Sequence, residues 1–192
     1  MKTPLRFQMT EYDCGTTSLQ NVLSYLFERE ETPADILKTI SLYTLDCYDE
    51  KGTSGQGGTS RESINLIIHW IQDYASKYNF KINTEHLTKE EITLDKITNC
   101  TKNNGCILIR TYMDVEHYVI LTNIDENNAY IWDPYYLDET YYDEEKFVEI
   151  IFDKPFNYNR KVNLRRFLAK TTSDFALGPI DKRDCVLFTR EK

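Results

Sequence analysis

Residues 7–26 read FQMTEYDCGTTSLQNVLSYL, which predicts a short extended lead-in followed by a helix that begins near Cys14. The apolar residues of this helix recur at the spacing of one helical face: Leu19, Val22, Leu23 and Leu26. Asp13 stands where a residue that caps the helix is expected. Because the N-terminus of a helix stabilises negative charge, this position favours a thiolate at Cys14.

The chemistry that this stretch indicates is nucleophilic attack by a thiol. A thiolate at Cys14 can attack a carbonyl carbon, and the oxyanion that forms needs hydrogen-bond donors. The Cys14 backbone N–H supplies one donor, and the side-chain amide of Gln8 is the candidate for the second. Gly15 leaves room beside the sulfur for the substrate. A buried structural thiol is the commoner role for a single cysteine, so the hypothesis also requires a base.

Among the three histidines, His117 is the candidate base. His69 lies in an amphipathic helical pattern, and His86 falls in a polar connection with no visible partner. His117 opens the apolar strand 117–124 (HYVILTNI), at an edge from which its ring can point into a cleft. A histidine in this role needs an acceptor that fixes its tautomer.

Asp133 is the candidate acceptor, because it ends the next predicted strand, 129–133 (AYIWD), before Pro134. Side chains on one face of a hairpin alternate by two residues. A plain four-residue turn at 125–128 would therefore put His117 and Asp133 on opposite faces. The hypothesis thus requires a turn with an odd number of residues or a β-bulge. The alternative role for Asp133 alone is the opening of an Asp-Pro turn.

The remaining pattern predicts an α+β fold, with helices first and antiparallel strands afterwards. Helices are expected after residue 32, after the capping sequence at 59–62 and after that at 88–91, and also at 143–151 and 160–170; a mobile glycine-rich loop is expected at 49–58, and further strands at 106–112 and 184–190. We expect a single domain over residues 1–192. Its helical lobe would extend to about residue 103, its sheet lobe would cover 104–192, and the segment from about 141 would be an unassigned extension.

Composition excludes several function classes. The net charge of -8 argues against a nucleic-acid backbone or an anionic membrane as the main partner. No segment is apolar and long enough for a membrane span, and the first residues lack a signal core. The five cysteines include no CxxC pair, so we expect no structural zinc, and we expect no other metal and no cofactor. Because their number is odd, we expect a reducing compartment, and without a signal core or a membrane span the expected location is the cytoplasm.

These motifs together resemble the bacteriocin-processing peptidases, family thirty-nine of the cysteine peptidases. FQMTEYDCGTTSLQNVLSYL is similar to their Gln and Asp-Cys-Gly opening, GTSRESINLI to their second helix, and HYVILTNIDENNAYIWDP to their His-strand-turn-strand-Asp-Pro segment. The resemblance covers roughly residues 5–140. It implies a papain-like fold, Cys14 as nucleophile, His117 as base, Asp133 as third member and Gln8 as oxyanion donor.

The resemblance also implies a substrate class. Members of this family cut leader peptides after two glycines, and many are domains of export transporters, so a precursor peptide and an export transporter are the expected partners. Two alternatives stay open at this stage. One is an acyltransferase on the same scaffold, and the other is a peptide-binding module without catalysis.

Overall fold

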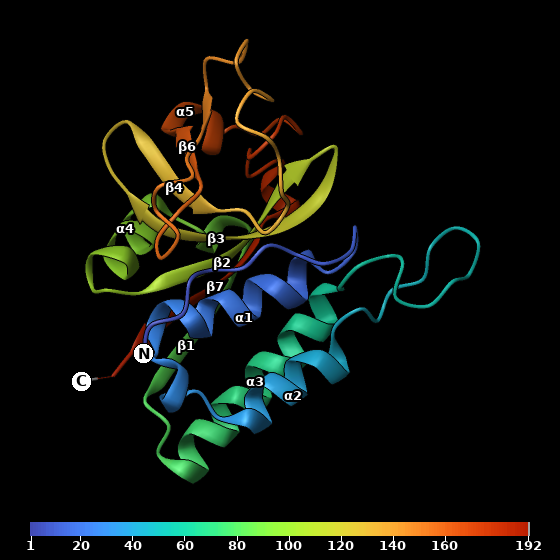
Figure 1. Ribbon diagram of the computed structural model, residues 1–192, viewed down its shortest axis with the longest axis vertical. Helices are drawn as coiled ribbons and strands as arrows, with labels where there is room; N and C mark the ends of the chain where they lie inside the picture. Colours follow the sequence, from blue (N-terminus) through green and yellow to red (C-terminus); the bar gives the residue numbers. More distant parts are fainter. Residues whose placement is uncertain (192) are drawn as a thin grey trace.

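The helix predicted to begin near Cys14 is helix α1, Cys14–Leu26, and its apolar face lies on a seven-stranded sheet (Figure 1). The structure is a computed structural model that describes residues 1–191. The other α-helices are α2 (Ala34–Tyr43), α3 (Arg61–Tyr78), α4 (Leu94–Lys102) and α5 (Leu164–Phe167). The strands are β1 (Ile82–Thr88), β2 (Cys106–Met113), β3 (Val115–Ile124), β4 (Asn128–Trp132), β5 (Val148–Ile150), β6 (Arg160–Asn163) and β7 (Asp184–Arg190). The expected α+β class is confirmed.

The strands form one antiparallel sheet in the order β1-β7-β2-β3-β4-β6-β5. The centre of the sheet is the hairpin β2–β3, whose strands carry the most continuous apolar sequence of the chain. Strands buried on both faces read as continuous apolar runs, which explains why these two were evident in the sequence.

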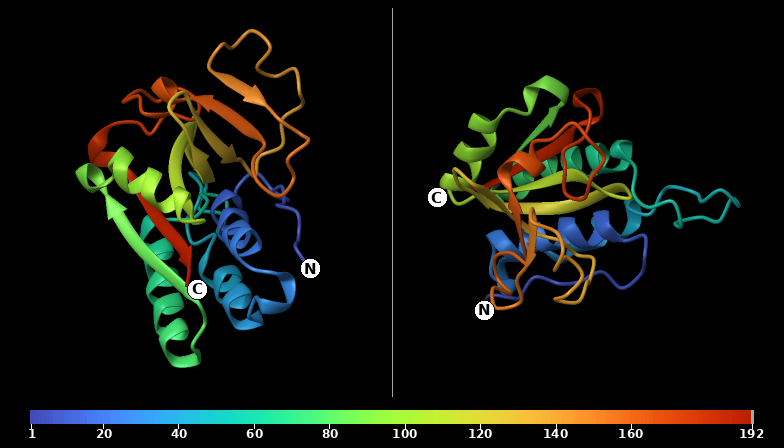
Figure 2. Two further views of the ribbon diagram at one scale, coloured as in Figure 1. Left: turned by 90° about the vertical axis from the view of Figure 1, so that its left-hand side faces the viewer. Right: turned by 90° about the horizontal axis from the view of Figure 1, so that it is seen from above.

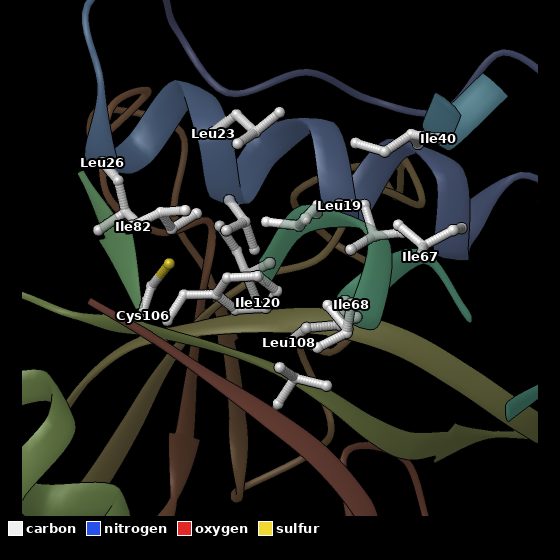
Figure 3. Close-up of a cluster of buried hydrophobic side chains, with 14 of the residues drawn as sticks. Leu19, Leu23, Leu26, Ile40, Ile67, Ile68, Ile82, Cys106, Leu108 and Ile120 are labelled. Carbon is white, nitrogen blue, oxygen red and sulfur yellow. The ribbon is translucent and has the colours of Figure 1, made fainter. Parts of the chain in front are cut away.

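The sheet is covered on both faces, and each face has its own apolar core. Helices α1, α2 and α3 cover one face, and α4 lies on the opposite one (Figure 1). Figure 3 shows the first core, in which Leu19 and Leu23 of α1 and Ile68 of α3 meet Leu108 and Ile120 of the sheet. This burial fixes α1 on the sheet. The first residue of α1, Cys14, then lies near the start of β3, the strand that carries His117.

The hairpin β3–β4 contains the bulge that the His–Asp hypothesis requires. Ile124 pairs with Ala129 across the four-residue turn, but beyond it Leu121 pairs with Ile131, so that Thr122 is the extra residue. The register shift places residues 117 and 133 on the same side of the hairpin. The predicted condition on the hairpin is confirmed.

The predictions of two helices in the C-terminal part of the chain were wrong. The segment predicted as a helix at 143–151 forms turns and then strand β5. The basic stretch 160–170, predicted as a solvated helix face, begins as strand β6, and only its middle is the short helix α5. Its first residue, Arg160, is completely buried. A buried ion pair explains this burial, and such a long-range partner has no local signal in the sequence.

The sheet does not begin at the expected boundary between a helical lobe and a sheet lobe near residue 103. The segment that contains His86 is strand β1, which pairs with β7 along its whole length (Figure 2). The segment after residue 141 is part of the body of the fold, because β7 lies between β1 and β2. Strands from the first half of the chain and from its C-terminal segment therefore belong to the same sheet that carries His117.

Residues 44–60 form the long connection from α2 to α3, which projects away from the body of the molecule (Figures 1 and 2). Its two arms are joined by an isolated bridge between Tyr48 and Ser54. At its base, the N–H of Cys47 donates to the carbonyl of Gly58. Within residues 1–191, none of the helices has both the length and the apolar character that crossing a membrane requires.

Candidate active site

Cys14 is the first residue of α1, is half-buried and lines an open cleft of about 910 Å³. Its neighbours in the lining include Tyr12, Gly58 and His117. As the first residue of a helix, Cys14 has a backbone N–H without an acceptor inside that helix. The N-terminal end of the helix dipole favours negative charge at this point.

His117 lies on β3 beside Cys14, with its side chain 6% exposed. Its Nε2 is 2.7 Å from Oδ1 of Asp133, which leaves Nδ1 as the ring nitrogen available to the thiol. Burial alone would lower the pKa of His117, but the charge of Asp133 and hydrogen bonds to Asp133 and Cys14 raise this pKa to about 10. The ring is therefore protonated at neutral pH.

The pKa of the Cys14 thiol shifts in the opposite direction. Burial by itself would raise the pKa of Cys14, but the hydrogen bond and the charge of His117 bring the pKa below its ordinary value. The two shifts are in the directions that favour a thiolate beside an imidazolium, the ion pair that makes a cysteine nucleophilic.

Asp133 follows β4 directly and is fully buried. Its Oδ1 also accepts a hydrogen bond of 2.9 Å from the N–H of Tyr135. The backbone of Asp133 is held on both sides by Asn159, whose Oδ1 accepts from the Asp133 N–H and whose Nδ2 donates to the Asp133 carbonyl, both at 2.7 Å. The other carboxylate oxygen, Oδ2, is 3.4 Å from the guanidinium of Arg160.

Gln8 lies in the lead-in, where its N–H donates to the carbonyl of Pro134 at 2.8 Å. Its side-chain Nε2 donates to the carbonyl of Thr10 at 2.8 Å, and its Oε1 is buried with no hydrogen-bond partner within residues 1–191. An amide nitrogen carries two hydrogens, so one N–H of Nε2 stays available. Gln8 makes no hydrogen bond to Cys14, His117 or Asp133 in the described part of the chain.

The structure therefore pairs His117 with Asp133 by a hydrogen bond, and it places Cys14 beside His117, where the pKa values of the two groups shift in opposite directions. It holds Gln8 against the residue that follows Asp133. Two further residues at this site, Asn159 and Arg160, were not predicted. No local pattern could have singled them out, because the bonds that they make reach back 26 and 27 positions along the chain.

Cys47, His86 and His69 have different environments. Cys47 lines the same cleft, but burial raises the pKa of its thiol. His86, expected to lack a partner, is 3.1 Å from Asp184 through Nε2. His69 makes a hydrogen bond to the carbonyl of Asn65 in its own helix. No group of three or more metal-ligating side chains is found within residues 1–191.

Comparisons with known proteins agree with this fold. A double glycine motif protease from an AMS/PCAT transporter, crystallised in complex with the leader peptide, is 16% identical over 98% of this chain and 92% of its own, with a TM-score of 0.47. A protein from Bacillus anthracis described as a C39-like peptidase is 16% identical over 98% of this chain and 96% of its own, with a TM-score of 0.55. No curated protein matches the chain.

The likeness to the Bacillus anthracis structure shows the papain-like fold, and it extends over the segment after residue 141 for which the sequence suggested no counterpart. The sequence itself matches the model of one protein family, the Peptidase_C39 like family, over residues 1–162. This match includes all four candidate residues and Arg160. The chain therefore belongs to the Peptidase_C39 like family.

Proposed function

We propose that this protein is a cysteine peptidase that cleaves a peptide bond, with Cys14 as the nucleophile. The observation that carries the proposal is the placement of Cys14 beside His117 in the lining of an open cleft, with Nε2 of His117 2.7 Å from Oδ1 of Asp133. The opposite pKa shifts of the thiol and the imidazole support it, because both favour a thiolate–imidazolium ion pair.

The reaction starts with attack of the Cys14 thiolate on the scissile carbonyl carbon, which forms a C–S bond and an oxyanion. The Cys14 N–H and the free N–H of Gln8 Nε2 stabilise that oxyanion. The imidazolium of His117 gives its proton to the leaving amine as the C–N bond breaks. Asp133 keeps the ring oriented and stabilises its charge.

The second half of the reaction restores the enzyme. His117, now neutral, takes a proton from a water molecule, and the resulting hydroxide attacks the thioester carbon. The C–S bond breaks, the thiolate leaves, and the acid product dissociates. Atoms and charge balance, since the proton that left with the amine is replaced by the proton from water.

For the substrate we propose a precursor peptide cut after Gly-Gly. The support for this finer proposal is the sequence resemblance over residues 5–140 to peptidases with that specificity. The test compares a peptide that contains Gly-Gly with one that contains Ala-Ala at the same positions. Cleavage of the first alone supports the specificity, and equal cleavage of both rejects it while leaving the thiol mechanism intact.

The mechanism is tested first by alkylation with iodoacetamide at a series of pH values, with labelled peptides read by mass spectrometry. Cys14 is expected to react at a pH well below the free-thiol value of about 8.5. Cys47 is the internal control, because it lines the same cleft with a raised pKa and should react only at higher pH. In His117→Ala, Cys14 should no longer be alkylated at a lower pH than Cys47. Equal labelling of Cys14 in the wild type and in this folded variant would reject the activated pair.

A further inference from the structure

Arg160 is a completely buried arginine that the proposed mechanism does not yet use. It opens β6, where it pairs with Ile131 of β4, two positions before Asp133. Its side chain lies on the far side of Asp133 from His117, because Asp133 offers Oδ1 to the imidazole and Oδ2 to the guanidinium. Both members of this ion pair are 0% exposed.

Backbone carbonyls hold two of the three guanidinium nitrogens, while Nε has no hydrogen-bond partner in the described part of the chain. Nη1 donates to the carbonyl of Asn159 at 3.0 Å, and Nη2 donates to the carbonyl of Tyr135 at 2.9 Å. These bonds fix the cation in one position, 3.4 Å from the carboxylate oxygen. The planar guanidinium meets both demands at once, whereas a single ammonium has one point of contact.

Burial of a charged arginine side chain costs free energy, because the charge loses its hydration. Taking a guanidinium out of water costs several kcal/mol, and burial lowers the pKa of Arg160 even with Asp133 beside it. Apolar residues would stabilise the same position more simply. The cation instead occupies the one site at which it can determine where the second carboxylate oxygen of Asp133 lies.

We infer that Arg160 is a positioning residue for the proposed cysteine peptidase reaction, which holds the carboxylate of Asp133 with one oxygen directed at His117. The inference rests on the proposed function. Within residues 1–191, Oδ2 of Asp133 has no hydrogen-bond partner and is stabilised by the charge of Arg160 alone. Without that charge, the buried carboxylate takes up a proton or turns to other donors. In both cases His117 loses its acceptor, and the imidazolium is destabilised.

The readout is the ionisation of His117 itself, followed by NMR on protein labelled with ¹⁵N-histidine. The chain has three histidines, so His69→Gln and His86→Gln assign the signals. The charged and titratable groups around the pair are Cys14 on α1, Arg160 on β6, and Tyr135 and Tyr142 on the connection after β4. All of them are retained in the variants except Arg160 itself.

The test compares the wild type with Arg160→Met, Arg160→Lys and Asp133→Asn. In the wild type the imidazolium should titrate at about 10. In Arg160→Met, which keeps the length of the side chain but removes its charge, the pKa should fall by about one unit or more, in the same direction as in Asp133→Asn. Arg160→Lys keeps the charge and should retain part of the wild-type value.

The outcomes separate the two proposals. An unchanged His117 pKa in folded Arg160→Met, with a lowered pKa in Asp133→Asn, would make Arg160 a merely structural residue and overturn the inference. A raised pKa would also overturn it, because the carboxylate would then stay in position without the guanidinium. If Asp133→Asn itself leaves the pKa unchanged, the proposed triad fails, and the role of Arg160, which acts through Asp133, fails with it. If Arg160→Met does not fold, Arg160→Lys becomes the test. A wild-type pKa of His117 in Arg160→Lys would show that the two-pronged guanidinium is not needed to position Asp133, and it would overturn the inference.

Discussion

At the scale of single residues, Asp13 has a different role from the one that its position suggested. It precedes α1 as a cap residue would, but its side chain makes no bond to the helix. Its carboxylate instead accepts from the N–H groups of Met9 and Thr10, at 3.2 and 2.8 Å. Asp13 thus closes the turn in which the Thr10 carbonyl holds the side chain of Gln8.

Gln8→Ala should slow peptide cleavage without changing the ionisation of the thiol. Removal of one oxyanion donor typically lowers kcat by about 10²–10³-fold. Alkylation of Cys14 by iodoacetamide forms no oxyanion, so its rate and its pH dependence should stay as in the wild type. Steady-state cleavage kinetics and alkylation rates measure the two effects separately. Parallel loss of both would show that Gln8 supports the local fold and not the transition state.

His86 provides a prediction about stability and pH. A hydrogen bond to Asp184 raises the pKa of His86 above its ordinary value. The stabilisation is therefore fully present below the unfolded pKa of about 6.5 and is lost as the pH rises through the higher folded pKa. Urea unfolding of wild type and His86→Asn should show a gap of less than about 1 kcal/mol at low pH, since the ring is partly exposed, and the gap should shrink as the pH rises. A gap that grows with pH would contradict this assignment.

At the scale of elements, the contact between α1 and the start of α3 depends on Gly15. A Cβ at Gly15 would lie 2.8 Å from the Cβ of Thr59 and 2.9 Å from its hydroxyl. The sequence suggested that this glycine leaves room for a substrate. The structure shows that it leaves room for Thr59, whose hydroxyl also accepts from the N–H of Leu45 at 3.2 Å.

Gly15→Ala should therefore destabilise the fold, by about 1–3 kcal/mol for an overpacked contact. Urea unfolding measures this loss. The matched variant is Gly15→Ala combined with Thr59→Gly, which removes the clashing Cβ. The two substitutions should be clearly non-additive, because they share one contact. Additive effects, or a stabilised Gly15→Ala, would show that the helix moves away at no cost.

The bulge at Thr122 sets the register of the hairpin that carries His117 and leads to Asp133. Deletion of Thr122 should leave the pairs of Leu121 with Ile131 and of Asn123 with Tyr130 in direct succession, so that His117 and Asp133 keep their shared face. We expect a folded protein whose Cys14 alkylation still depends on His117. Deletion of Leu121 is the control, because it permits the same register but moves a threonine into an apolar core position. Loss of the His117 dependence in the Thr122 deletion, with the fold intact by circular dichroism, would reject this register argument.

At the scale of the whole molecule, the sequence predicted the parts of the fold that have strong local patterns. The helix at Cys14 and the apolar strands β2, β3 and β7 were found because their burial repeats at a regular spacing. Strand β1 was missed because INTEHLT is largely polar and exposed, and its pairing is with residues a hundred positions away. The site followed the same rule, since Cys14, His117 and Asp133 begin or follow recognisable elements, whereas Arg160 is defined by a distant partner.

The C-terminal segment is integral to the site, since β7 pairs with β1 and with β2, and β2 in turn carries β3. A chain that ends at residue 183 would lose the strand between β1 and β2 and would expose the edge of β2 to water. We therefore expect this chain not to fold cooperatively, although it still contains all four candidate residues and Arg160. A chain that ends at Arg190 keeps β7 and is the matched control. Circular dichroism and thermal unfolding should show a cooperative transition for the control alone. A cooperative 183-residue chain with His117-dependent alkylation of Cys14 would mean that β2, β3 and α1 form the site by themselves.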